Sequence, residues 1–204
     1  MIEKEKLKRM EPKKKLEYIW RYYKPAIFGV IAVIALIFGI KDYYEQSKIK
    51  TVLSMTVVNS MANDTETPEQ KIKETLGYKD DPYSKVEIGV NLTTDSEMAE
   101  FDYNAQMAYV AQIQAGSIDI MIMPEKLYQT LKKNEPFADL KELMGEEAFE
   151  KFGMQTDTTH ISITDSELEQ ELGVIYDPVC IAVPYSAPNQ ENAVKWIKSL
   201  DSRK

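Results

Sequence analysis

The sequence is poor in the residues and motifs that build cross-links and catalytic centres. It contains one cysteine, Cys180, and one histidine, His160. A single cysteine excludes an internal disulfide, so the fold must depend on its core. We interpret Cys180 as a small buried hydrophobic residue and His160 as a surface or strand residue. The sequence lacks CxxC, HExxH, a calcium loop, G-x-S-x-G, G-x-G-x-x-G and a P-loop. We therefore expect a protein that is not an enzyme, with no metal site and no cofactor.

Charge is missing from one stretch, residues 25–40, which reads "PAIFGVIAVIALIFGI". Sixteen residues of helix extend about 24 Å, slightly short of a hydrocarbon core of about 30 Å. Aromatic residues flank the stretch, among them Trp20 and Tyr43, as they do at membrane interfaces. We interpret residues 25–44 as a transmembrane signal anchor whose partner is the lipid bilayer.

Two other interpretations of this stretch fit less well. A buried core helix does not explain why charge is absent from every face. A cleaved signal peptide needs a small-x-small site, which the sequence "IKDYYEQ" lacks. Residues 1–24 carry nine Lys/Arg against four Asp/Glu, and such basic flanks stay in the cytoplasm. We therefore predict a single-pass cell-membrane protein with a cytoplasmic tail, residues 1–24, and an extracytoplasmic domain, residues 45–204.

The remainder of the chain is acidic. Residues 41–204 contain 16 Lys/Arg and 29 Asp/Glu, a net charge of about −13. This surface repels nucleic-acid phosphates, so we expect no nucleic-acid partner.

Strand and helix patterns alternate along residues 51–131. This order predicts an α/β layer with a mainly parallel sheet flanked by helices. We expect strands at 51–61, 84–93, 117–124, 160–163 and 174–184. We expect helices from Pro68 to Gly77, from Asp95 or Ser96 to Ala115, after Pro124, in two short pieces before Gly153, in a capped turn at Thr164, and at 189–200. The apolar run 117–124 is typical of a strand buried on both faces.

These elements resemble extracellular solute-binding proteins with the type 2 periplasmic-binding fold. The sequence "AYVAQIQAGSIDIMIMPEKLYQTLKKNEPFADL" is similar to that family's amphipathic helix, Ala-Gly, x-D-I strand, short helix and x-F-x-D-L. The sequence "VCIAVPYSAPNQENAVKWIKSL" is similar to its late strand, Ser-x-x-Asn turn and terminal helix. The resemblance covers about 51–140 and 174–200.

The resemblance also has a gap. Complete family members carry a second lobe, inserted roughly where residues 141–173 lie here, and about thirty residues cannot build a lobe of ordinary size. We therefore predict a single-lobe relative: a membrane-anchored, non-catalytic binding or interaction module with an envelope or transporter protein as partner. The alternative is a solute receptor subunit of an envelope transporter.

Ligands in open α/β sheets lie beyond the carboxyl ends of the strands. Asn59, Ser60, Met123 and Tyr185 are placed at strand ends by the patterns above, and they are our candidate ligand-binding residues. Ordinary cap and turn roles are the alternative for all four. We interpret Asp119 as structural, because a buried carboxylate without a partner is costly, and we expect it at the start of its strand, bonded to loop amides.

Overall fold

A computed structural model describes residues 12–134, 136–153, 155 and 157–200. The chain divides into two compact units, Met1–Lys48 and Ile49–Lys204, and each is described by itself.

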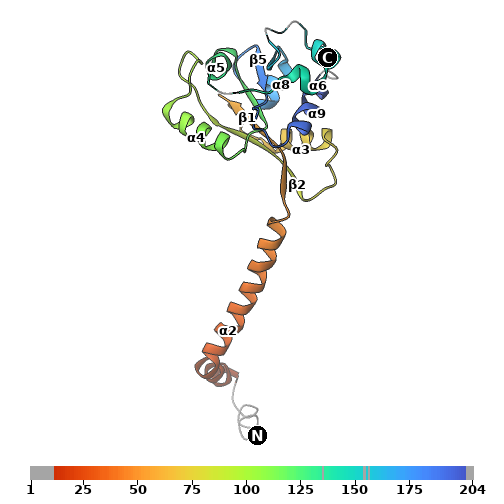
Figure 1. Ribbon diagram of the computed structural model, residues 1–204. Helices are drawn as coiled ribbons and strands as arrows, with labels where there is room; N and C mark the ends of the chain where they lie inside the picture. The colour runs from red at the N-terminus through yellow and green to blue at the C-terminus, as the bar shows by residue number, and fades with distance from the viewer. Residues whose placement is uncertain (1–11, 135, 154, 156, 201–204) are drawn as a thin grey trace. The chain divides into compact units, whose positions relative to one another are not determined.

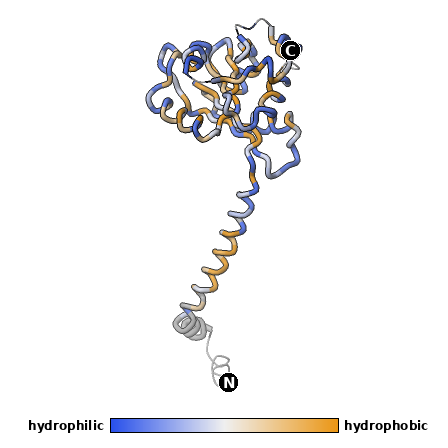
Figure 2. Tube along the Cα trace, viewed as in Figure 1, coloured by the Kyte–Doolittle hydropathy of each residue, from blue (hydrophilic) through white to orange (hydrophobic). Residues whose placement is uncertain are grey.

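The described residues of the first unit form a long helix, α2 (Pro12–Gln46). Its apolar side chains between Phe28 and Ile40 are exposed, and Figure 2 shows this hydrophobic stretch of the helix. Within the described part of the chain, no helix combines the length and the apolar character that crossing a membrane requires.

The second unit is built on a five-stranded sheet in the order β2-β1-β3-β5-β4. The strands are β1 (Lys50–Val58), β2 (Ser84–Leu92), β3 (Ile120–Pro124), β4 (His160–Ile163) and β5 (Val179–Ala182). The strand β1 pairs in parallel with β2 and β3, whereas β5 pairs antiparallel with β3 and β4. The unit is therefore α/β, as predicted. Its sheet is mixed, however, and the prediction of a mainly parallel sheet was wrong for the pairs that involve β5.

The antiparallel direction of β5 follows from the place where the chain leaves the preceding helix. The helix α8 (Ser166–Leu172) follows β4 and ends at Gly173, whose carbonyl accepts a hydrogen bond from Met61 N just beyond the carboxyl end of β1. The chain therefore stays at the edge where β4 ended, and it can only enter β5 from that edge.

Helices cover both faces of the sheet (Figure 1). The remaining helices are α3 (Glu66–Thr75), α4 (Tyr103–Gln114), α5 (Glu125–Leu131), α6 (Leu140–Met144), α7 (Glu146–Glu150) and α9 (Gln190–Leu200). One hydrophobic cluster joins one sheet face to α3, α6, α7, α8 and α9, and the other joins the opposite face to α4 and α5. Alternate residues of β3 enter the two clusters, and all five are buried. The predicted central strand buried on both faces is confirmed.

Several element boundaries differ from the predictions by two or three residues, and two differ by more. The helix α4 begins at Tyr103, with Asp102 as its N-cap, and not at Asp95. The Asp95 carboxylate instead accepts from Ala99 N and Glu100 N, which closes a turn. The late strand occupies only Val179–Ala182, because proline at 178 cannot donate to a sheet ladder.

Candidate functional site

The predicted residues Asn59 and Ser60 lie together at the carboxyl edge, which we define as the sheet edge where β1, β2, β3 and β4 end. Asn59 Nδ2 donates to Thr94 Oγ1 at 2.7 Å, and Asn59 Oδ1 accepts from Thr94 N at 2.9 Å. Ser60 Oγ donates to the Leu172 carbonyl at 2.6 Å. Both side chains therefore join the loops at this edge, as the cap-and-turn interpretation would have it, and their ligand role stays a prediction.

The other two predicted residues differ from this pair, one in burial and the other in position. Met123 is fully buried in β3, opposite Cys180. Tyr185 is 70% exposed, and it follows β5, which runs opposite to β3. It therefore lies at the amino edge, where β1 and β3 begin. Met123 therefore shares the carboxyl edge with Asn59 and Ser60 but is buried. Tyr185 lies at the opposite edge, because the grouping assumed that the late strand was parallel.

Asp119 has the structural position expected of it. It is fully buried immediately before β3. One carboxylate oxygen accepts from Ser54 N at 2.7 Å and from Asn189 Nδ2 at 3.0 Å, and the other accepts from Asn189 N at 2.8 Å. The side chain thus joins β1, β3 and the start of α9.

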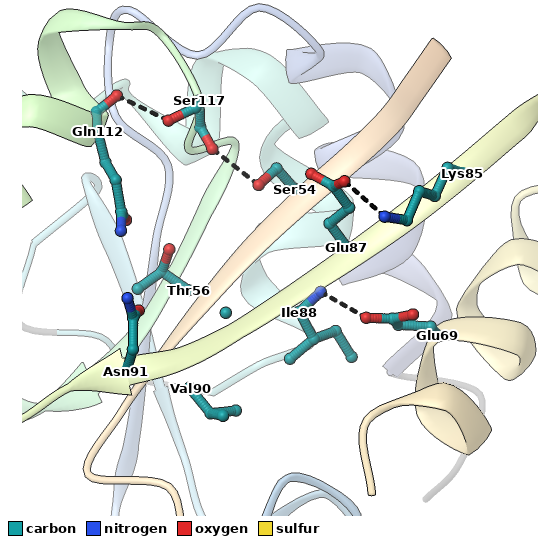
Figure 3. A pocket seen from close by; sticks show the side chains of 11 residues that line it. Ser54, Thr56, Glu69, Lys85, Glu87, Ile88, Val90, Asn91, Gln112 and Ser117 are labelled. Carbon is teal, nitrogen blue, oxygen red and sulfur yellow. Dashed lines mark hydrogen bonds and ion pairs between the residues drawn. The ribbon is translucent and has the colours of Figure 1, made fainter. Parts of the chain in front are cut away.

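A polar groove of about 510 Å³ lies over β1 and β2 (Figure 3). We call it the β1–β2 groove, and its lining is Ser54, Thr56, Glu69, Lys85, Glu87, Ile88, Gly89, Val90, Asn91, Gln112 and Ser117. Short side chains on the strands keep the groove open: at Gly89 an added Cβ would meet its nearest atoms at 3.8 Å, so the space is free for a methyl group.

The groove contains hydrogen-bonding groups that the fold does not use. In Figure 3 the side chains of Thr56, Asn91 and Gln112 face the same space. No hydrogen bond joins the amide of Asn91 or of Gln112 to another described side chain or backbone group. Each amide offers two donors and an acceptor, which suits a ligand rich in hydroxyl or amide groups.

The outer rim of the groove carries both signs of charge. Lys85 pairs with Glu87 at 2.8 Å, and this hydrogen bond raises the pKa of Lys85. Glu69 Oε1 accepts from Ile88 N at 2.9 Å, so one donor of the edge strand β2 is already bonded. Because carboxylates outnumber the ammonium group here, the groove disfavours anions.

A second polar cluster lies at the carboxyl end of β3. Glu125, His160 and Cys180 each place one potential metal-ligating atom within 4.8 Å of the other two. His160 and Cys180 are fully buried, whereas Glu125 is partly exposed. His160 Nδ1 lies 3.0 Å from Asp157 Oδ1. Of the described residues, this is the group whose chemistry suits a metal ion.

Burial and hydrogen bonds together set the pKa values of this cluster. Burial and the adjacent Glu125 carboxylate raise the pKa of the Cys180 thiol. Burial alone would raise the pKa of Asp157, but hydrogen bonds from Lys132, Thr159 and His160 outweigh it and hold that pKa well below its usual range. Asp157 is therefore a fixed anion beside the imidazole.

The sequence predicted neither the β1–β2 groove nor the cluster of Glu125, His160 and Cys180, which we call the β3 cluster. The three residues of the β3 cluster are 35 and 20 positions apart, so no short motif joins them. A clue did exist: the only histidine and the only cysteine both occur in predicted strands, but strand order was needed to place them on neighbours. The groove residues are common polar types with no distinguishing pattern.

Comparison with known proteins adds no family. No family model matches the sequence, and neither the curated proteins nor the solved structures include a significant match. The resemblance to solute-binding proteins therefore stays a hypothesis based on sequence patterns.

Proposed function

We propose that this protein is a membrane-anchored, extracytoplasmic, non-catalytic binding module that resembles one lobe of a solute-binding protein. Its domain would engage an envelope or transporter protein through the β1–β2 groove. The groove supports this proposal because it is open and polar, and because it presents amide groups that no described residue satisfies.

The observation that carries the proposal is the course of the chain after α5. In the family it resembles, the second lobe is inserted near residues 141–173. Here that segment forms α6, α7, β4 and α8, and β4 pairs with β5 in the one sheet. Among the described residues nothing remains to close over a solute from the other side. A small solute in an open groove buries less surface than the 70–90% typical of ligand pockets, which favours a macromolecular partner.

The membrane anchor is the second part of the proposal. Residues 25–40 carry no charge, and the apolar side chains from Phe28 to Ile40 are exposed on all sides of α2. Exposed apolar surface is unfavourable in water, so this stretch needs an apolar environment. Protease added to intact cells should digest the region 41–204; protection of that region would contradict the proposed outward orientation.

The groove can be tested with a crosslinking pair. A photo-crosslinking residue at position 91 should give one discrete protein adduct in intact cells, whereas the same residue at exposed position 104 on α4 should not. The crosslinking residue can also be placed at position 89, in the same groove, so that Asn91 and Gln112 can both be replaced. The double variant N91A/Q112A should reduce the adduct formed from position 89, and the matched double variant N104A/Q106A should leave that adduct unchanged. Equal adducts from positions 91 and 104 would contradict a partner in the groove.

The receptor alternative predicts a different result. Sugars, peptides or amino acids would then raise the unfolding temperature of the full chain by several degrees, and N91A/Q112A would abolish the rise. We expect no such stabilisation across these three compound classes.

A further inference from the structure

The ligand atoms of the β3 cluster have the spacing of a metal site. Two ligand atoms that lie about 2.0–2.1 Å from a tetrahedral zinc ion are about 3.3 Å apart. Nε2 of His160 lies 3.3 Å from Oε2 of Glu125. Cys180 adds a sulfur within 4.8 Å of both atoms, and a shift of that sulfur by at most about 1 Å would complete three of the four corners.

The Glu125 carboxylate is held with one oxygen turned toward this space. Oε1 accepts from Gln129 Nε2 at 2.8 Å, one turn along α5. Oε2 is buried and accepts no hydrogen bond from a described residue. A buried carboxylate oxygen without a hydrogen bond is costly, and a cation would remove that cost.

His160 is held in the orientation that a metal ligand needs. Nδ1 faces Asp157, so Nε2 is directed at Glu125. The Tyr128 ring lies against the imidazole with centroids 4.2 Å apart, and its hydroxyl also bonds Asp157. Metal-binding histidines commonly donate their other nitrogen to a carboxylate in this way.

The charges also balance around a divalent ion. A thiolate and a carboxylate neutralise two positive charges, and His160 would bind as the neutral imidazole. The remaining anion, Asp157, is already paired with Lys132. Thiolate and imidazole ligands favour zinc over magnesium or calcium.

We propose that Glu125, His160 and Cys180 bind one zinc ion, with Asp157 positioning the histidine and the fourth coordination site left to water. The 32% exposure of the Glu125 side chain gives the ion a route from solvent. On binding, the Cys180 thiol forms a sulfur–zinc bond and releases its proton to water. This site is separate from the β1–β2 groove and stands independently of the proposed function.

The single histidine and cysteine make the test unambiguous. The full chain, purified in detergent without a polyhistidine tag, should bind one equivalent of Co²⁺ and show a thiolate-to-cobalt charge-transfer band. One equivalent of Zn²⁺ should displace the cobalt and shift the ¹⁵N signal of His160 Nε2 to that of a metal-bound nitrogen. Mg²⁺ should do neither.

Variants assign the ligands. Glu125→Gln and Cys180→Ser should each weaken Zn²⁺ binding at least tenfold, and Cys180→Ser should also remove the charge-transfer band. Asp157→Asn should weaken Zn²⁺ binding about 10–100-fold. The control Glu147→Gln replaces an exposed glutamate in the first turn of α7 and should bind as the parent does.

The wild-type ¹⁵N measurement needs no variant to fold. An unchanged His160 signal with stoichiometric Zn²⁺ would overturn the proposal. Parent-like Zn²⁺ affinity in Glu125→Gln and Cys180→Ser would overturn it equally.

Discussion

The two ends of β3 each carry an acidic residue that is wholly or partly buried, and the two are satisfied very differently. Asp119 precedes the strand and accepts three hydrogen bonds from Ser54 and Asn189. Glu125 follows the strand and accepts one, from Gln129, while its buried Oε2 accepts none. The same strand therefore ends in a closed network on one side and an incomplete one on the other.

This difference separates structure from candidate function. A buried carboxylate costs free energy unless it is hydrogen-bonded, and folded proteins leave few such groups unsatisfied. Asp119 has the partners that make it a link between β1, β3 and α9. Glu125 lies beside an imidazole and a thiol. The lack of a hydrogen bond to its buried Oε2 is the reason to look for a ligand there and not at Asp119.

The largest loss of stability is expected from a substitution at Gly173. It tests whether the carboxyl edge is tightly packed away from the open space beside Glu125. A Cβ at Gly173 would lie 2.4 Å from Ala62 N and 2.8 Å from its Cα, and φ is +62°. Gly173→Ala should lower the free energy of unfolding by about 4 kcal/mol, from overpacking plus the left-handed backbone. Urea unfolding followed by tryptophan fluorescence would measure it.

Gly116→Ala is the matched control for this substitution. Gly116 has nearly the same φ, +60°, but no atom within 4 Å of its added Cβ. Only the backbone penalty of about 1 kcal/mol should remain. Equal losses in the two variants would mean that the contact with Ala62 contributes nothing.

Asp119→Asn tests the closed end of β3. The amide must turn a donor toward Ser54 N or Asn189, which are donors themselves. We expect a loss of about 3 kcal/mol, since unsatisfied buried groups cost about 1–3 kcal/mol each. A loss below about 1 kcal/mol would show that this network is not what joins β1 to α9.

A smaller effect is expected beside the open end. The Tyr128 hydroxyl bonds Asp157 at 3.1 Å and Thr159, and Tyr128→Phe should cost about 1 kcal/mol. Tyr103→Phe, at an 82% exposed position on α4, should cost nothing measurable in the same urea experiment. If neither substitution changed the free energy of unfolding, the Tyr128 hydroxyl would contribute nothing to the hydrogen bonds that hold Asp157 beside His160.

The sequence predicted local features well where a single segment determines them. The apolar run around Met121 predicted a strand buried on both faces, and the isolated Asp119 predicted a satisfied structural carboxylate; both are confirmed. The terminal helix is also confirmed, as Gln190–Leu200. These features depend on periodicity and burial, which neighbouring residues encode.

Features that depend on strand order were not predictable in the same way. The direction of β5 is set by the place where the chain leaves α8. That place is next to Ala62, which precedes Gly173 by more than a hundred residues in the sequence. That direction moves Tyr185 to the amino edge and brings Cys180 beside His160 and Glu125. No local pattern carries this information, so both the predicted site and the missed cluster depended on one unpredicted reversal.

The smallest effect on stability is expected from Glu125→Gln, which makes the same chemical change as Asp119→Asn at the other end of β3. The amide oxygen can still accept from Gln129, and the amide nitrogen can donate to the imidazole. We expect a change below about 1 kcal/mol in the metal-free chain, because no satisfied hydrogen bond is lost. The same concentration of Zn²⁺ should raise the unfolding temperature of the parent more than that of this variant. A loss as large as that of Asp119→Asn would mean that Glu125 is structural too, and the contrast between the two ends of the strand would disappear.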